Sequence, residues 1–194
     1  MLKQIKDLGT EKTIPADTDL IPFQQTNGVT GHITRANFLA GITSGGNDSK
    51  YIQLLDKRAS GVNGGTPTTG SWNNRIINII ATDQTSKVTL SSNNFILPPG
   101  DYWIDVKAAF YRPYEVKLRL LNATANTVLL TGLNAYIGNL DCMTITCLSG
   151  FISVLENQSL AIQYRCNGAF AGFGLGVANG FEEEVHLIAD IFKL

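Results

Sequence analysis

The sequence predicts an all-β, antiparallel sandwich preceded by an extended N-terminal arm. After residue 50, short apolar or alternating runs recur, with glycine, proline and asparagine marking the reversals between them. The stretch from Gly61 to Tyr102 combines turn signals, a tryptophan and two apolar runs. Helical periodicity is almost absent, and nine or ten short strands at this spacing favour a sandwich.

Composition limits the classes of function. The 194 residues, 44% of them hydrophobic, suit one domain plus an extension. Fifteen basic against sixteen acidic residues leave no charge excess to attract nucleic acid or an anionic membrane. Charged residues make up only 16%, below the roughly 25% typical of soluble domains. We therefore expect a surface partly covered by copies of the chain or by a partner.

Neither a signal peptide nor a membrane span is expected. The first 20 residues contain no apolar core followed by a small-residue cleavage site, and no run of about 18 apolar residues occurs. The sequence therefore predicts a soluble protein that is synthesised in the cytoplasm and not inserted in a membrane.

Residues 1–48 do not resemble part of the sandwich core. Proline, glycine and aspartate interrupt every apolar run, so this arm cannot bury enough surface to offset its ordering entropy alone. Residues Ile33–Leu39 are expected to form about two helical turns capped by Thr34, and Thr43–Ser49 a flexible linker. The arm is either a disordered tail or a segment that docks on another surface.

From residue 50 the pattern changes to strands. Segment 75–80 is apolar nearly throughout, which favours a strand buried on both faces. In segment 102–108 the even-numbered residues are apolar and share one face, which is expected to be core. The other expected strands are 51–55, 88–90, 95–97, 115–120, 127–130, 150–155, 160–166 and 185–192.

The number and spacing of cysteines and histidines predict no metal site, no bound cofactor and no enzymatic activity. Cys142, Cys147 and Cys166 form an odd set, which favours buried thiols over a disulfide framework, although a link between the first two stays open. The only histidines, His32 and His186, lack zinc spacing and a neighbouring nucleophile or paired acid. No paired-carboxylate pattern suggests a depolymerase either.

Three further features could be ligand-binding sites, but a structural role explains each of them better. Glu182–Glu184 could hold Ca²⁺, but adjacent strand residues point to opposite faces, so a solvated turn is favoured. Gly172–Gly176 lacks the lysine and the following helix of a phosphate loop. Trp72 and Trp103 are expected to be core or interface anchors rather than sugar platforms.

Two phrases carry a resemblance to a known family. Phe95–Tyr102 is similar to the "F-x-x-P-x-G-x-Y" strand entry of C1q/TNF-like jelly rolls. A second phrase resembles "D-x-K-A-S-G-x-x-G-G-x-x-x-x-G-x-W-x-x-R-x-L-N" of a bacteriophage branch of these domains. The likeness continues at 120–124, 163–166 and 172–174, and it covers residues 51–194. The residues that match the second phrase are Asp56, Lys57, Ala59, Ser60, Gly61, Gly64, Gly65, Gly70, Trp72, Arg75 and Asn78.

The resemblance implies a homotrimer of antiparallel jelly-roll β-sandwiches. In that family the first and last strands lie together near the three-fold axis, and we expect Arg75 to pair within the trimer. The expected trimer-interface residues are Tyr51, Gln53, Trp72, Arg75, His186 and Phe192.

The arm has a looser likeness of its own. The phrase "L-I-P-F-x-x-x-x-G-x-x-x-x-I-T-R-A-N-F" from Leu20 to Phe38 resembles leaders of phage structural proteins. We therefore expect a capsid decoration or cement protein on the outer capsid surface of a virion. Domain 1–48 would attach to the major capsid protein or another virion protein, and domain 49–194 would be displayed. The expected capsid-binding residues are Leu20, Ile21, Phe23, Ile33, Arg35, Phe38 and Leu39.

An alternative function stays open at this stage. The domain could be the receptor-binding knob of a tail or head fibre, with a host surface glycan held in the loops near Gly64–Trp72 and Phe170–Gly176. The sequence alone does not separate the two hypotheses, because one fold hosts many functions.

Overall fold

The computed structural model describes residues 20–24, 30–34, 37, 49–138, 141–156 and 158–194. The chain divides into two compact units, Met1–Asp48 and Ser49–Leu194. Within the described ranges, no helix has the length and apolar character needed to cross a membrane.

The first unit contains a two-stranded antiparallel sheet. Strand β1 (Leu20–Gln24) pairs with β2 (Thr30–Thr34), so Ile33 belongs to a strand and not to the helix predicted to include it. Asn37 has helical conformation, and its backbone N–H donates to Thr34 Oγ1 at 3.2 Å, the bond expected of a cap at Thr34. The rest of the predicted helix and residues 43–48 of the predicted linker lie outside the described residues.

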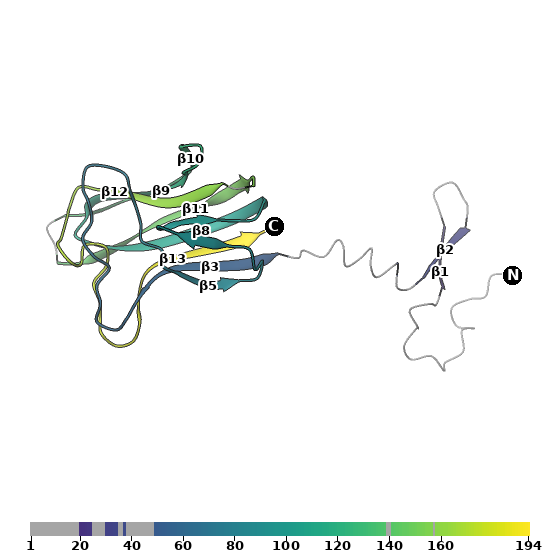
Figure 1. Ribbon diagram of the computed structural model, residues 1–194, viewed down its shortest axis with the longest axis horizontal. Helices are drawn as coiled ribbons and strands as arrows, with labels where there is room; N and C mark the ends of the chain where they lie inside the picture. Colours follow the sequence, from purple (N-terminus) through teal and green to yellow (C-terminus); the bar gives the residue numbers. More distant parts are fainter. Residues whose placement is uncertain (1–19, 25–29, 35–36, 38–48, 139–140, 157) are drawn as a thin grey trace. The chain divides into compact units, whose positions relative to one another are not determined.

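The second unit is a sandwich of two antiparallel sheets, as predicted (Figure 1). The β12 sheet has the order β10 (Thr127–Ile137), β9 (Tyr114–Asn122), β12 (Ser159–Cys166), β7 (Asn94–Ile96), β6 (Thr89–Ser91), and β4 (Asn73–Asn74) also pairs with β12. The β8 sheet has the order β11 (Met143–Val154), β8 (Gly100–Tyr111), β13 (Glu184–Lys193), β3 (Lys50–Arg58), β5 (Ile79–Asp83).

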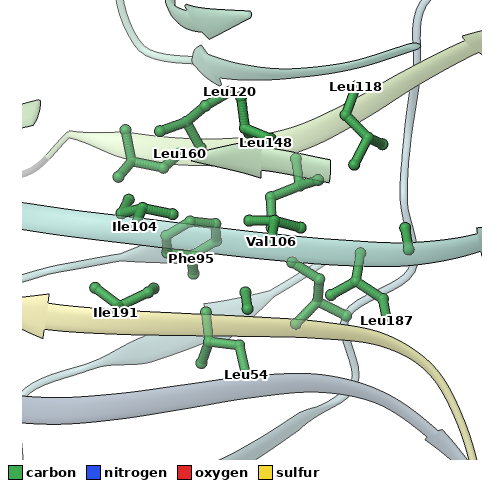
Figure 2. Packing of buried hydrophobic residues seen from close by; sticks show 14 of the residues in the cluster. Leu54, Phe95, Ile104, Val106, Leu118, Leu120, Leu148, Leu160, Leu187 and Ile191 are labelled. Carbon is green, nitrogen blue, oxygen red and sulfur yellow. The ribbon is translucent and has the colours of Figure 1, made fainter. Parts of the chain in front are cut away.

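The core lies between the sheets, where alternate residues of both layers meet (Figure 2). Ile104 and Val106 of β8 face Leu118 and Leu120 of β9, and all four are fully buried. Each such side chain contributes roughly 2 kcal/mol by leaving water. The predicted alternation of 102–108 is confirmed, because its even-numbered residues are at most 1% exposed.

Segment 75–80 is not the single buried strand that its apolar run suggested. Strand β4, which comes just before the segment, pairs with β12 in one sheet. Strand β5, which begins at Ile79, pairs with β3 in the other sheet. The Arg75 N–H donates to Ile162 O at 2.8 Å, and the Asn78 N–H donates to Leu55 O at 2.9 Å. The backbone therefore crosses from one sheet to the other over residues 75–78, and an apolar run does not distinguish such a crossing from a buried strand.

The other predicted strands are present, with different ends. β11 begins at Met143, seven residues before the expected strand 150–155, because its first half is a threonine-rich alternating segment with no long apolar run. β6 and β7, which correspond to the expected strands 88–90 and 95–97, form a hairpin, and its turn residues Ser92 and Asn93 have φ values of 51° and 65°. Positive φ at both positions matches the right-handed twist of the flanking strands.

All three cysteines are free thiols. Cys166 is buried, as expected, whereas Cys142 and Cys147 are only partly buried. Burial raises the pKa of the Cys166 thiol to about 11, and the nearby positive charge of Arg75 limits this rise.

The Cys166 thiol should make the fold less stable in alkali. An unfolded thiol ionises near its ordinary pKa of 9.0, and the folded thiol only near 11. Stability should therefore fall as the pH rises from 9 to 11, since only the unfolded state releases the proton there. Urea unfolding gives the free energy of unfolding at pH 8 and at pH 10. The decrease between these two pH values should be roughly 1 kcal/mol smaller in Cys166→Ala than in the wild type. Equal falls would contradict this origin of the pH dependence, and Cys142→Ala is the matched control.

Candidate functional site

The outer face of the β8 sheet carries a row of four aromatic side chains. Phe192 of β13 lies opposite Tyr51 of β3 and also opposite Trp103 of β8, which in turn lies opposite Phe151 of β11. The ring centroids of Tyr51 and Phe192 are 5.2 Å apart, and those of Trp103 and Phe151 are 4.6 Å apart. We call these four residues the aromatic row.

Much of this row faces outward, without cover from the described residues of the second unit. Phe151 is 67% exposed, and Ile145, on the same face of β11, is 64% exposed. The outer face of an antiparallel sheet is usually polar when it is solvated. A row of rings with aliphatic neighbours on such a face is typical of a surface that another subunit or ligand covers.

A polar row lies beside the aromatic row. Asp190 accepts hydrogen bonds from Tyr51 Oη at 2.6 Å and from Gln53 Nε2 at 2.9 Å. Partial burial raises the pKa of Tyr51 to about 12, and its bond to Asp190 adds to this rise. Asp105 lies directly opposite Asp190, and Lys107 pairs with Asp105 and offsets the repulsion between the two carboxylates.

The six residues expected at a trimer interface do not share one surface. Tyr51, Gln53 and Phe192 lie together on the outer face of the β8 sheet, and β3 and β13 are adjacent, as the resemblance implied. Trp72 precedes β4 and lies on the opposite layer, against Arg119 of the β12 sheet. The position of a loop residue in the sequence does not show which of the two sheets its side chain packs against.

Arg75 is buried inside its own chain and so cannot pair with another subunit. Its side chain is 0% exposed and lies over the Phe110 ring, with 4.9 Å between Cζ and the ring centroid. Its Nη2 donates to Leu175 O at 3.1 Å and to His186 O at 3.0 Å. Desolvation lowers the pKa of Arg75 to about 10, and the negative charge of Asp56 opposes this shift.

His186 also points inward, which corrects its expected interface role. A β-bulge between Val185 and Leu187 lets both His186 and Leu187 be buried. The His186 Nε2 atom is 3.1 Å from Val62 O. Gly176, with φ of 136°, passes so close to the imidazole that a Cβ atom there would collide with it. His186 therefore fixes two loops at the end of the sandwich opposite the C-terminus (Figure 1).

Glu184 ties the same two loops together and is not part of a solvated turn. Its Oε1 accepts backbone N–H groups of Gly61 at 3.0 Å and Gly180 at 2.7 Å. These bonds lower the pKa of Glu184, while Glu182 and Glu183 are exposed as expected. The sequence gives no sign of which of three consecutive glutamates turns inward. In the described ranges, no group of three or more His, Cys, Asp or Glu side chains could hold a metal ion.

Phe170 and Phe173 of the 168–183 loop pack against other side chains of the second unit. Phe170 and Phe173 each contact Tyr111, with ring centroids 5.5 Å and 5.1 Å apart. Arg112 lies over the Phe170 ring at 4.4 Å. Phe170 and Phe173 therefore stabilise the loop, and the hypothesis of a glycan held by loop aromatics rests mainly on Trp72.

Trp72 lines a groove on the outer face of the β12 sheet. The groove has a volume of about 420 Å³, within the range of small-ligand sites. Its other walls come from β9, β10, β12 and the residue after β12, and they include Lys117, Tyr136 and Arg165. We call it the Trp72 groove. Sequence analysis did not find it, because its residues converge only when three strands pair.

The expected capsid-binding residues belong to the first unit. Leu20, Ile21 and Phe23 lie in β1, and Ile33 lies in β2. The remaining members, Arg35, Phe38 and Leu39, lie outside the described residues.

Solved structures with the same architecture belong to the C1q/TNF-like jelly rolls. Murine APRIL matches with a TM-score of 0.51 at pH 5.0 and 0.50 at pH 8.5, each at 8% identity over 76% of this chain and 100% of APRIL. The globular domain of zebrafish complement 1qA protein matches with a TM-score of 0.47 at 14% identity, over 76% of this chain and 98% of that domain. No protein-family model and no curated protein matches the sequence. The APRIL match establishes the predicted C1q/TNF-like jelly-roll fold.

The Glu184 bonds should stabilise the loop end only while the carboxylate is charged. Because its folded pKa is below the ordinary 4.5, this stabilisation is present above pH 4.5 and is lost as the pH falls through the folded pKa. Glu184→Gln should lower the melting temperature at pH 7 and speed proteolysis of the 168–183 loop, with the difference from wild type shrinking towards pH 3. Glu182→Gln, at an exposed position, is the control and should change neither the melting temperature nor the rate of proteolysis. If the Glu184→Gln variant were destabilised equally at pH 3 and pH 7, the charge-based explanation would be contradicted.

Proposed function

We propose that this chain is a structural protein of a bacteriophage virion, where it forms a homotrimer of jelly rolls that decorates the capsid. The aromatic row is the observation that carries the oligomeric part of the proposal. The phage part rests on the sequence resemblance at 56–78 and in the arm.

Packing through the outer face of the β8 sheet would cover the aromatic row. Tyr51, Phe192, Trp103 and Phe151 span four neighbouring strands, so their rings offer one continuous patch. Aromatic side chains are enriched in interface cores, where they bury a large area with few rotatable bonds. The C1q/TNF-like resemblance implies three-fold association with the first and last strands near the axis, and these strands carry half of the row.

The polar row beside it would set the register of the subunits. Asp190 is held by Tyr51 and Gln53, and Asp105 is paired with Lys107. Burying a carboxylate that already has a hydrogen-bond or ion-pair partner costs less free energy than burying a free one, so these two can lie at an interface. Their fixed positions disfavour sheet packings that would bring like charges together.

The first unit supports an attachment role for the arm. A two-stranded hairpin such as β1–β2 is marginally stable by itself in water, so it gains stability by lying on another surface. Three arms on one trimer would bind together, and avidity would exceed the affinity of one arm by roughly a hundredfold or more. The capsid shell, which repeats the same surface many times, is the partner we propose for it.

A receptor-binding knob is the second candidate function. The Trp72 groove favours it, because the groove lies on the β12 sheet and packing through the β8 sheet would leave it open. Copy number separates the two functions, since hundreds of chains per particle indicate decoration and a few dozen indicate a fibre.

The aromatic row can be tested by its effect on molecular mass. Wild type should sediment at equilibrium as a species of three times the 21.0 kDa chain, and Phe151→Asp should sediment as a monomer with an unchanged β circular dichroism spectrum. The charge would be buried without a partner in the trimer, which weakens association strongly. Phe181→Asp, at an exposed loop phenylalanine, is the matched control and should stay trimeric. A monomeric wild type at micromolar concentration would refute the trimer.

The arm can be tested separately from the trimer. Removing residues 1–45 should leave a folded trimer that no longer co-sediments with capsids lacking the protein. Full-length protein should bind such capsids. Binding retained by the truncated trimer would show that the arm is not the attachment segment, and would leave the trimer result unaffected.

A further inference from the structure

The Trp72 groove presents two parallel rows of side chains on paired strands. Lys117 of β9 lies opposite Arg165 of β12 and opposite Asn134 of β10. Two residues before Lys117, and so on the same face of β9, Glu115 lies opposite Tyr136. Both rows line the groove, with Trp72 as a further wall.

The first row concentrates positive charge that no acidic side chain in the described part of the chain pairs with. Lys117 and Arg165 are direct cross-strand neighbours, an arrangement that is unfavourable between like charges. Within the described residues, neither side chain has an ion pair or a hydrogen bond. Several other surface cations do have a carboxylate partner, such as Lys107 with Asp105 and Lys57 with Glu183. Two adjacent unpaired cations in a groove are the arrangement expected of a site for an anionic group.

The second row supplies groups that bind hydroxyls, and one hydrogen bond orients part of it. Glu115 Oε2 accepts the Nδ2–H of Asn167 at 2.9 Å, which orients both side chains. A carboxylate, an amide and the Tyr136 hydroxyl together offer donors and acceptors on one face of the groove. Tyr136 is 66% exposed, so its ring face is open to a ligand.

Trp72 packs against a hydrogen-bonded arginine at the side of the groove. Arg119 lies over the indole at 4.2 Å, and Arg119 Nε donates to Gln163 Oε1 at 2.8 Å. Gln163 in turn donates to Asn74 Oδ1 at 2.8 Å. Arg119 is not a wall of the groove, so the indole presents another part of its surface there. An aromatic side chain fixed before binding loses little entropy when a ligand packs against it.

We propose that the Trp72 groove binds an acidic saccharide, with the sugar carboxylate between Lys117 and Arg165. In this arrangement the second row binds ring hydroxyls, and Trp72 and Tyr136 pack against the apolar C–H faces of the sugar. This site rests on the receptor-binding function proposed above, and it names the ligand class and the residues that bind it.

The groove fits a saccharide better than an acidic peptide. An extended peptide usually adds to a free strand edge through backbone hydrogen bonds, whereas the groove lies over three strands that already pair with one another. The groove combines two cations with a carboxylate, Glu115, which would repel a run of acidic side chains. A sugar with one carboxylate and several hydroxyls matches both rows.

Binding can be measured on the full-length protein with three probes. These are a disaccharide that ends in glucuronic acid, the matched disaccharide that ends in glucose, and tetraglutamate. Quenching or enhancement of tryptophan fluorescence, confirmed by calorimetry, should show saturable binding of the acidic disaccharide and at least tenfold weaker binding of the neutral one. Raising the salt concentration should weaken binding of the acidic disaccharide and leave binding of the neutral disaccharide unchanged.

Variants assign the interaction to the groove. Lys117→Gln and Arg165→Gln should each weaken binding of the acidic disaccharide about tenfold and leave the weak neutral binding unchanged, because each removes one charge-assisted hydrogen bond. Tyr136→Ala should weaken both sugars. Lys87→Gln, at an exposed cation outside the groove, is the matched control and should have no effect. The substituted positions lie on the surface, so folding can be checked by circular dichroism and trimer mass.

Several results would overturn the proposal. Equal affinity for the acidic and neutral sugars would remove the role of Lys117 and Arg165, and tighter binding of tetraglutamate would assign the groove to a peptide. No saturable binding of the acidic disaccharide would exclude this ligand class at the groove. If the trimers still adhered to host cells in that case, receptor binding would stand and its site would lie elsewhere; if they did not, the receptor-binding function itself would fail.

Discussion

The buried guanidinium of Arg75 is the interaction on which the loop end of the sandwich depends. A charge in an apolar core is costly, so its surroundings must supply compensating groups. Two carbonyl oxygens, the Phe110 ring and the negative charge of Asp56 do so here. Because these groups belong to β3, β8, β13 and the 168–183 loop, the contacts of one cation connect four parts of the chain.

Once that end is fixed, the two sheets can present different surfaces. The outer face of the β8 sheet carries the aromatic row and a polar row in which Asp105 is paired with Lys107 and Asp190 is hydrogen-bonded. The outer face of the β12 sheet carries the Trp72 groove, where Lys117 and Arg165 have no ion pair among the described residues. Paired charges suit a surface that becomes buried, and unpaired charges suit one that meets a soluble ligand. The proposed functions follow from this difference in electrostatics.

Sequence patterns predicted the elements better than the places where the chain leaves them. Period-two alternation located most strands, because each has one buried and one wet face. It failed at 75–80, where an apolar run crosses between sheets, and it did not find the β1–β2 hairpin. The Asn27-Gly28 pair between two apolar clusters is a known hairpin signal and could have indicated that pairing.

The sequence by itself determined the sandwich class and most strands, because alternation and turn residues act locally. That the first and last strands lie side by side was implied only by the resemblance to C1q/TNF-like jelly rolls. Only the tertiary structure decided which side chains meet. It placed Arg75 and His186 inside, Trp72 and Phe192 on opposite layers, and Lys117 beside Arg165. Strand register and loop packing bring together residues far apart in sequence, and the motif containing Trp72 and Arg75 does not say which one faces a partner.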